Sequence, residues 1–129
     1  MKILLDTHAL IWAMNDDSRF GPAARKAIRS RANQVFVSAA SLWEAATKFR
    51  LGKFPEAKLL VDNPSKILSS MGFDPLPITI EHARLAGSIE SSHRDPFDRM
   101  LAAQSRLEGM ILASADAMFD ALDVARLWS

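Results

Sequence analysis

The sequence predicts an α/β fold built on a central parallel sheet, and three observations support this prediction. Three short apolar runs, at 3–5, 35–37 and 110–113, are typical of buried parallel strands. Segments with helical spacing separate these runs, and strands that alternate with helices favour a parallel sheet. A polar residue follows each run directly, as expected where strands end at an edge that binds ligands.

The expected helices begin and end at recognisable signals. Pro22 stands at the first position of one helix, where proline is tolerated, and Asn33 is a plausible end. Apolar residues at 42, 45, 46 and 49 predict an amphipathic helix that ends near Gly52. The remaining expectations are helices over 9–14, 56–71 (broken at Asn63-Pro64), 80–91, 96–108 and a short one after Asp116, with an edge strand in 73–78 and a last strand over 124–128.

Length and composition narrow the class of protein. The 129 residues predict one domain, 1–129, and the absence of cysteine excludes disulfide scaffolds, thiolate metal sites and cysteine nucleophiles. The formal charge of +1 combines a basic part, nine Lys/Arg against four Asp/Glu in 1–54, with an acidic part, seven against eleven in 55–129. The near-balance argues against a polybasic nucleic-acid or membrane binder. With no apolar run near ~20 residues and no signal region, we expect a cytoplasmic protein.

Five acidic residues are expected near one edge of the sheet. Asp6 and Asp116 follow the first and third strands, and Glu44 lies two turns into the helix after the second. Asp95 and Asp98 share a face at the start of the helix that precedes the third strand. Clustered carboxylates repel one another, and a divalent cation removes that cost. Oxygen ligands favour Mg²⁺ or Mn²⁺, which suggests metal-dependent phosphoryl chemistry.

Each acid also has a structural interpretation. Asp6 could cap the first helix, and Glu44 could complete a capping box with Ser41 or pair with Lys48. Asp95 before a proline is a strong capping pattern, which would place Asp98 in a first turn that favours carboxylates. In the same way, Asp116 could cap the short helix that follows it.

Four blocks of the sequence, spread over residues 3–116, resemble one known family. In the family's order they are Ile3-Leu4-Leu5-Asp6-Thr7-His8-Ala9-Leu10-Ile11-Trp12, Val37-Ser38-Ala39-Ala40-Ser41-Leu42-Trp43-Glu44, His93-Arg94-Asp95-Pro96-Phe97-Asp98-Arg99-Met100-Leu101-Ala102-Ala103-Gln104 and Leu112-Ala113-Ser114-Ala115-Asp116. The chain therefore resembles PIN-domain ribonucleases, and more narrowly the VapC toxins of bacterial type II toxin–antitoxin pairs.

The resemblance implies a PIN-like three-layer α/β/α sandwich and a Mg²⁺- or Mn²⁺-dependent endoribonuclease. It assigns catalysis and metal binding to Asp6, Glu44, Asp98 and Asp116. A metal would activate water for in-line attack on the phosphodiester and leave 5′-phosphate and 3′-hydroxyl ends. The implied partners are an RNA substrate, a VapB-type antitoxin and a second copy in a homodimer. Residues expected beside the metal or the substrate are Thr7, Ser114, Asp95 and Arg99.

Other basic and aromatic residues are less specific. The row Arg25, Lys26, Arg29 could meet RNA phosphates or an acidic partner, or could simply be a solvated helix face, and Arg94 could hold substrate phosphate beside Arg99. Trp12 and Trp43 are expected in the core or at an interface.

Two competing functions stay open. A receiver-like phosphoacceptor domain also places acids at a sheet edge, but it needs a lysine after a late strand, and no lysine follows Lys66. A PIN-like binding module without catalysis would keep the fold, although all four acids are present.

Overall fold

The computed structural model describes residues 1–129 and is built on a five-stranded sheet in which every pair is parallel. The strand order is β3-β2-β1-β4-β5, so β1 is central and β3 and β5 are the edges. Short apolar strands with helical crossovers produce this arrangement. The strands are β1 (Lys2–Leu5), β2 (Gln34–Ser38), β3 (Asp74–Leu76), β4 (Ile111–Ala113) and β5 (Arg126–Leu127).

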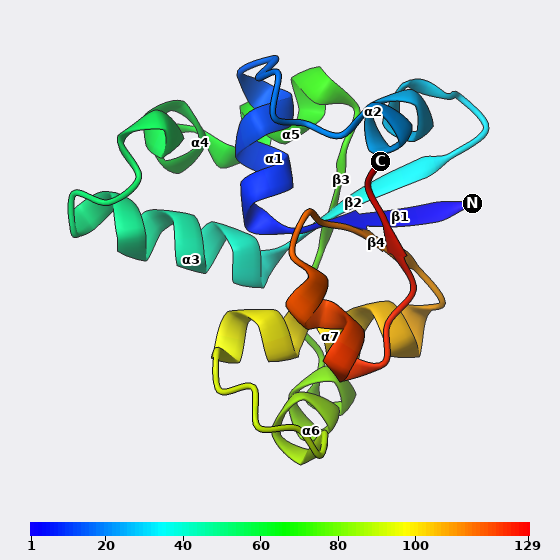
Figure 1. The fold of residues 1–129 in the computed structure, drawn as a ribbon. Coiled ribbons are helices and arrows are strands. Elements are labelled where there is room, and N and C mark those ends of the chain that lie inside the picture. The colour runs from blue at the N-terminus through cyan, green and yellow to red at the C-terminus, as the bar shows by residue number, and fades with distance from the viewer.

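Helices cover both faces of the sheet, so the predicted α/β/α sandwich is confirmed. Figure 1 shows α1, α2 and α5 on one side of the strands and α6 and α7 on the other. The helices are α1 (Thr7–Met14), α2 (Pro22–Arg29), α3 (Ala39–Arg50), α4 (Lys58–Asp62), α5 (Pro64–Met71), α6 (Ile80–Ser88) and α7 (Pro96–Glu108), with 3₁₀ turns η1 (Pro55–Ala57) and η2 (Ala117–Leu122).

The central strand β1 divides the core into two clusters. Because successive strand residues point to opposite faces, Ile3 and Leu5 join the cluster under α1 to α5, whereas Leu4 joins the cluster under α6, α7 and η2. All three side chains are fully buried. Because β1 is packed on both faces, the core sets the position of its carboxyl end. Asp6 comes directly after that end.

Most of the expected elements are present, with shifted ends. The edge strand in 73–78 is confirmed as β3, and the break at Asn63-Pro64 separates α4 from α5. Gly109 ends α7 in the left-handed conformation (φ 65°). The expected last strand over 124–128 is shorter, and only Arg126 and Leu127 pair with β4.

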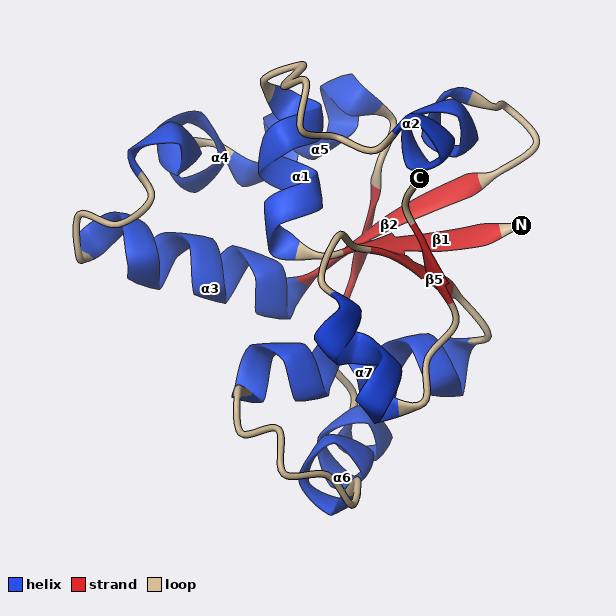
Figure 2. Cartoon of the chain, in the orientation of Figure 1, coloured by secondary structure: helices blue, strands red, loops and turns tan.

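The C-terminal segment packs against the start of α2. Figure 2 shows β5 leading to a C-terminus beside α2, and the Ala24 N–H donates to the Trp128 carbonyl over 2.9 Å. A Cβ on Gly21 would stand 2.3 Å from that carbonyl oxygen, so only glycine fits there. None of the helices combines the length and apolar character that crossing a membrane requires.

Candidate active site

Asp6 lies at the carboxyl end of β1 and begins α1. Its N–H donates to the Ala113 carbonyl of β4 (3.1 Å), which extends the strand pairing to this residue. One carboxylate oxygen accepts the Ala9 N–H over 2.7 Å, so the capping role is confirmed. The side chain is 7% exposed. Capping accounts for one carboxylate oxygen, and the other accepts no backbone N–H in the structure.

Glu44 is buried on α3, and two neighbours contact its carboxylate. Thr7 donates its hydroxyl to Glu44 Oε1 (2.6 Å) and also lies 3.1 Å from the Ser41 hydroxyl, while Lys48 Nζ contacts Oε2 over 2.6 Å. The Lys48 pairing predicted from the sequence is confirmed. The capping-box alternative is wrong, because Ser38, not Ser41, caps α3. Ser41 instead contacts Thr7, and no pattern in the sequence predicts that contact.

Asp98 lies in the first turn of α7 and contacts a histidine. His93 Nε2 is 2.8 Å from Asp98 Oδ2, and both side chains are largely buried. Asp95 caps the helix, accepting the N–H groups of Phe97 (2.9 Å) and Asp98 (3.2 Å). Sequence reasoning left His93 without a role, although its position in the same short block as Asp98 was the available signal.

The carboxylates of three separate elements influence one another electrostatically. Burial raises the pKa of Asp6 above its ordinary value of 3.8, and the charge of Glu44 adds to the rise, while the Ser114 hydroxyl, the Ala9 N–H and His8 oppose it. Burial also raises the pKa of Asp98 to about 6, with further contributions from Asp95 and Glu44, against the opposing effect of His93. Asp6, Glu44 and Asp98 therefore form one acidic group.

Asp116 lies apart from that acidic group. It is exposed and caps η2 by accepting the Met118 N–H (2.9 Å), as the alternative interpretation expected. Its own N–H donates to the buried Ser114 hydroxyl over 3.0 Å, directly after β4. Ser114 neighbours both Asp6 and Asp116, so it connects the two positions at the carboxyl ends of β1 and β4. No contact in the structure joins Asp116 to the other acids.

Two arginines near the acids differ in their availability. Arg99 donates to the carbonyls of Ala86 (2.8 Å), His93 (2.9 Å) and Ile89, and so fixes the loop between α6 and α7. Its predicted contact with substrate remains a prediction, since its guanidinium is already engaged. Arg94 is exposed and forms none of the molecule's ion pairs.

The donor atoms of the acidic group are of the chemical type that a hard divalent cation prefers. No three carboxylate or imidazole side chains lie close enough together to hold one metal ion. The donors in the acidic group are nevertheless carboxylate oxygens, and those of Asp6 and Asp98 resist ionisation because they are buried next to other negative charges. A cation among them would remove that penalty, and oxygen donors suit Mg²⁺ or Mn²⁺.

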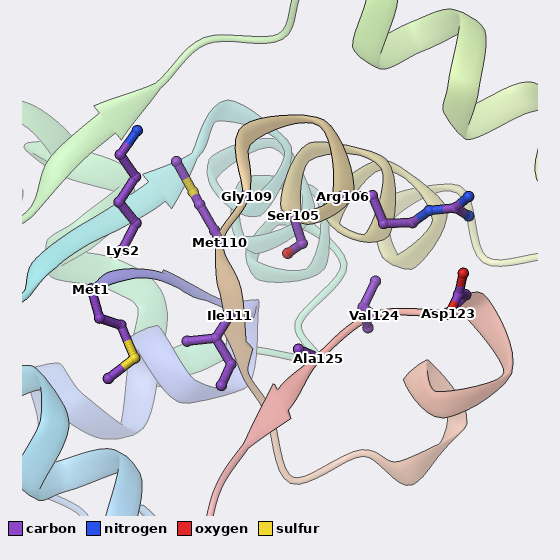
Figure 3. Close-up of a pocket in the computed structure, with 10 residues that line it drawn as sticks. All are labelled: Met1, Lys2, Ser105, Arg106, Gly109, Met110, Ile111, Asp123, Val124 and Ala125. Carbon is purple, nitrogen blue, oxygen red and sulfur yellow. The ribbon is translucent and has the colours of Figure 1, made fainter.

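A separate pocket lies at the opposite end of the strands. Its volume is about 670 Å³, and Figure 3 shows that residues before or at the starts of β1, β4 and β5, including Lys2, Ile111 and Ala125, line it together with Ser105 and Arg106 of α7. Asp6 and Asp116, by contrast, come after the carboxyl ends of β1 and β4. The pocket is therefore not part of the acidic group.

Comparison with known families identifies the class of protein. The sequence matches the PIN domain family model over residues 3–125, nearly the whole chain. The chain therefore belongs to the PIN domain family, and the family predicted from the four sequence blocks is confirmed. No curated protein sequence matches the chain.

Solved structures with the same fold include components of toxin–antitoxin systems. VapBC2 from Rickettsia felis, bound to a DNA fragment from its promoter, has a chain with a TM-score of 0.74 at 14% identity, covering all of both chains. VapC20 from Mycobacterium tuberculosis, a toxin that cleaves the sarcin–ricin loop, gives 0.70 at 18%, with coverage of 98% and 99%. VapBC-1 from nontypeable Haemophilus influenzae gives 0.66 at 15%, with coverage of 98% and 97%. The TM-scores show that these chains share the fold, and at identities this low the similarity shows the fold alone.

Proposed function

We propose that this chain is a Mg²⁺- or Mn²⁺-dependent endoribonuclease, the toxin of a type II toxin–antitoxin pair. The observation that carries the proposal is the acidic group itself. Asp6, Glu44 and Asp98 come from three elements of a PIN fold, and burial together with mutual charge raises the pKa of two of them. Carboxylates whose pKa values are raised by burial and by neighbouring charges are concentrated at functional sites.

The proposed roles rest on the chemistry of each side chain and on the family blocks in which these residues lie. Asp6, Glu44 and Asp98 would hold the cation, with Asp116 joining them from the end of β4. When bound, the cation would activate water and stabilise the charge that develops on the leaving oxygen. Thr7 fixes the orientation of the Glu44 carboxylate, and His93 does the same for Asp98. Ser114 lies beside Asp6 and binds the Asp116 N–H.

The proposed partner is a VapB-type antitoxin. This proposal is supported by the shared fold of FitAcB from Neisseria gonorrhoeae, which is covered to 96% of its chain, and of a chain in a toxin–antitoxin complex from Klebsiella pneumoniae, which is covered to 90%. The exposed basic residues of α2 offer a surface for an acidic partner or for RNA phosphate. The proposal also includes a homodimer of two copies of this chain.

The test is the loss of cleavage when single acids are neutralised. Asp6→Asn and Asp98→Asn should each reduce Mg²⁺-dependent cleavage of total RNA by more than about 100-fold, because each removes a negative cation ligand. Both variants should stay folded, since asparagine can still accept the bonds made by these carboxylates. Asp62→Asn, an exposed acid on α4, is the matched control and should keep full activity. Wild-type activity in either site variant would refute the assignment.

A second measurement tests the cation directly. Millimolar Mn²⁺ or Mg²⁺ should raise the melting temperature of the wild type, because an ion that binds only the folded state stabilises it. The increase should be smaller in Asp98→Asn and unchanged in Asp62→Asn. If the wild type shows no shift and cleaves no RNA, the chain is a PIN-fold binding module rather than a nuclease. If the wild type does cleave RNA, sequencing of RNA ends after induced expression identifies its target.

A further inference from the structure

An exposed indole and a half-buried phenyl ring form a pair at the positions that precede two residues of the acidic group in the sequence. Trp43 is 62% exposed on α3, and its ring meets that of Phe97 on α7 edge-on, with centroids 4.9 Å apart and an interplanar angle of 80°. Trp43 precedes Glu44, and Phe97 precedes Asp98. Of the two positions expected for Trp43, core or interface, its exposure excludes the core and leaves the interface. An indole left this exposed commonly marks a contact surface.

The geometry of the two helices explains this placement. Consecutive helical residues project about 100° apart, so Glu44 points into the protein while Trp43 points outward. The same offset separates Phe97 from Asp98. Because α3 packs against α7, the two aromatic rings meet at the surface while the two acids lie next to them.

A small pocket opens next to the aromatic pair. Its volume is about 230 Å³, and its lining includes Trp43 and Phe97 together with Ile78 and Met100. Arg94, the exposed arginine without an ionic partner, also lines it. The pocket therefore combines flat aromatic and apolar walls with one guanidinium that forms no ion pair, and two of its lining residues, Trp43 and Phe97, directly precede Glu44 and Asp98 in the sequence.

We infer that this pocket binds an unpaired nucleobase of the RNA substrate, with Trp43 as the stacking surface and Arg94 on an adjacent phosphate. The inference rests on the proposed ribonuclease function and deepens it by assigning a base-binding subsite to the pocket between α3 and α7. A base inside a duplex is stacked and paired on both sides and cannot enter such a pocket, whereas unpaired bases stack on exposed aromatic rings. Arg94 adds the positive charge that a phosphate needs.

The test measures binding separately from cleavage. Fluorescence anisotropy with a labelled 12-nucleotide single-stranded RNA of mixed sequence, in the inactive Asp98→Asn background, reports affinity without turnover. Adding Trp43→Ala should weaken binding about 5- to 150-fold, the range expected for one base–aromatic stack. Trp43→Phe should retain most of the affinity. Leu59→Ala, at an equally exposed apolar residue on α4, is the matched control and should bind as the background does.

A duplex probe and a salt titration separate stacking from charge. Binding to the same sequence as a 12-base-pair duplex should be weak and insensitive to Trp43→Ala. Arg94→Gln should lower the slope of log affinity against log salt by about 1, as expected for the loss of one phosphate contact. Trp43→Ala should leave that slope unchanged.

Three outcomes would overturn the inference. One is unchanged single-strand affinity in Trp43→Ala; another is equal weakening for single strand and duplex. The third is a Trp43→Ala variant that keeps its RNA affinity but no longer binds a co-expressed antitoxin, which would assign the pocket to a protein partner. Failure of the proposed nuclease is distinguishable, because Trp43-dependent binding would then persist while the wild type cleaves nothing.

Discussion

Asp98 is subject to opposing influences. Burial and the charges of Asp95 and Glu44 disfavour its ionised form, while His93 at 2.8 Å favours it, and the net result is a pKa of about 6. At neutral pH the residue is therefore ionised at a cost to folding. A carboxylate held in this way suits a cation ligand, since the bound ion removes the cost.

Neutralising Asp98 should therefore stabilise the metal-free protein in a pH-dependent way. The folded-state pKa lies above the ordinary value of 3.8, so the stabilising contribution of the protonated form is complete below about pH 4 and is lost as pH rises through about 6. Asp98→Asn should consequently be more stable than the wild type at pH 8, with the gain shrinking towards pH 4. Urea denaturation in EDTA at pH 8, 6 and 4 measures the difference.

The pKa of Asp120 is shifted in the opposite direction from that of Asp98. Its pKa is lowered because Arg126 pairs with it over 3.0 Å, so its ionised form favours folding above its ordinary pKa. Asp120→Asn should not stabilise the protein at pH 8. A gain for Asp98→Asn that grows towards acid pH would contradict the account given for this residue.

Asp95, at the start of helix α7, has two candidate roles. Asp95 both caps the helix and adds negative charge beside Asp98. Its cap bonds are visible in the structure, whereas a catalytic role is only implied by the family block in which it lies.

Two substitutions at Asp95 separate these roles. Asp95→Ala removes the cap and should lower the free energy of unfolding by about 0.5–2 kcal/mol. Asp95→Asn keeps a capping oxygen and should retain stability close to that of the wild type. If capping is the whole role, Asp95→Asn also cleaves RNA at the wild-type rate, measured with the same substrate. Loss of cleavage in a stable Asp95→Asn variant would instead place the carboxylate in the reaction.

Elements were predictable where local chemistry decides them. Pro22, the break at Asn63-Pro64, the Asp95-Pro96 start and the Gly109 end of α7 all lie where the sequence placed them, because proline and glycine restrict the backbone directly. The true cap of α3 was missed, because Ser38 and Ser41 are both capping residue types and only the length of β2 decides between them. The β5 pairing was overestimated for a similar reason, since strand ends depend on the neighbouring strand.

For the whole molecule, the parallel sheet made the position of the acidic edge predictable but not its contacts. Asp6 and Ser114 follow paired strands, as strand order alone requires. The contacts of Thr7 with Glu44 and of His93 with Asp98 join distant or loop segments, and no periodicity in the sequence encodes them. The basic excess of residues 1–54 includes the exposed face of α2, whereas part of the acidic excess belongs to the site through Asp98.

Closure of the fold by the C-terminal segment depends on one glycine. Gly21→Ala would place a methyl group 2.3 Å from the Trp128 carbonyl oxygen, and backbone must move to accommodate it. We expect a loss of about 1–3 kcal/mol in the free energy of unfolding, from overpacking. Hydrogen exchange should show faster exchange at the Ala24 amide, which bonds to the same carbonyl.

Gly87→Ala is the matched control for this substitution. A Cβ there meets nothing within 4 Å, and the residue lies in α6, so the change should be neutral or stabilise by up to about 1 kcal/mol. Equal destabilisation by the two substitutions would show that loss of glycine freedom, rather than contact with Trp128, determines the effect.

The pairing of Lys48 with Glu44 has a consequence for how the protein matures. A buried carboxylate without a counter-charge would oppose folding, yet Lys48 already neutralises Glu44 at 2.6 Å from within the same helix. Lys48 therefore acts as the counter-ion of Glu44, and the core can form around this carboxylate without a bound cation. For the proposed nuclease, folding and cation binding would then be two separate events, because the first does not depend on the second.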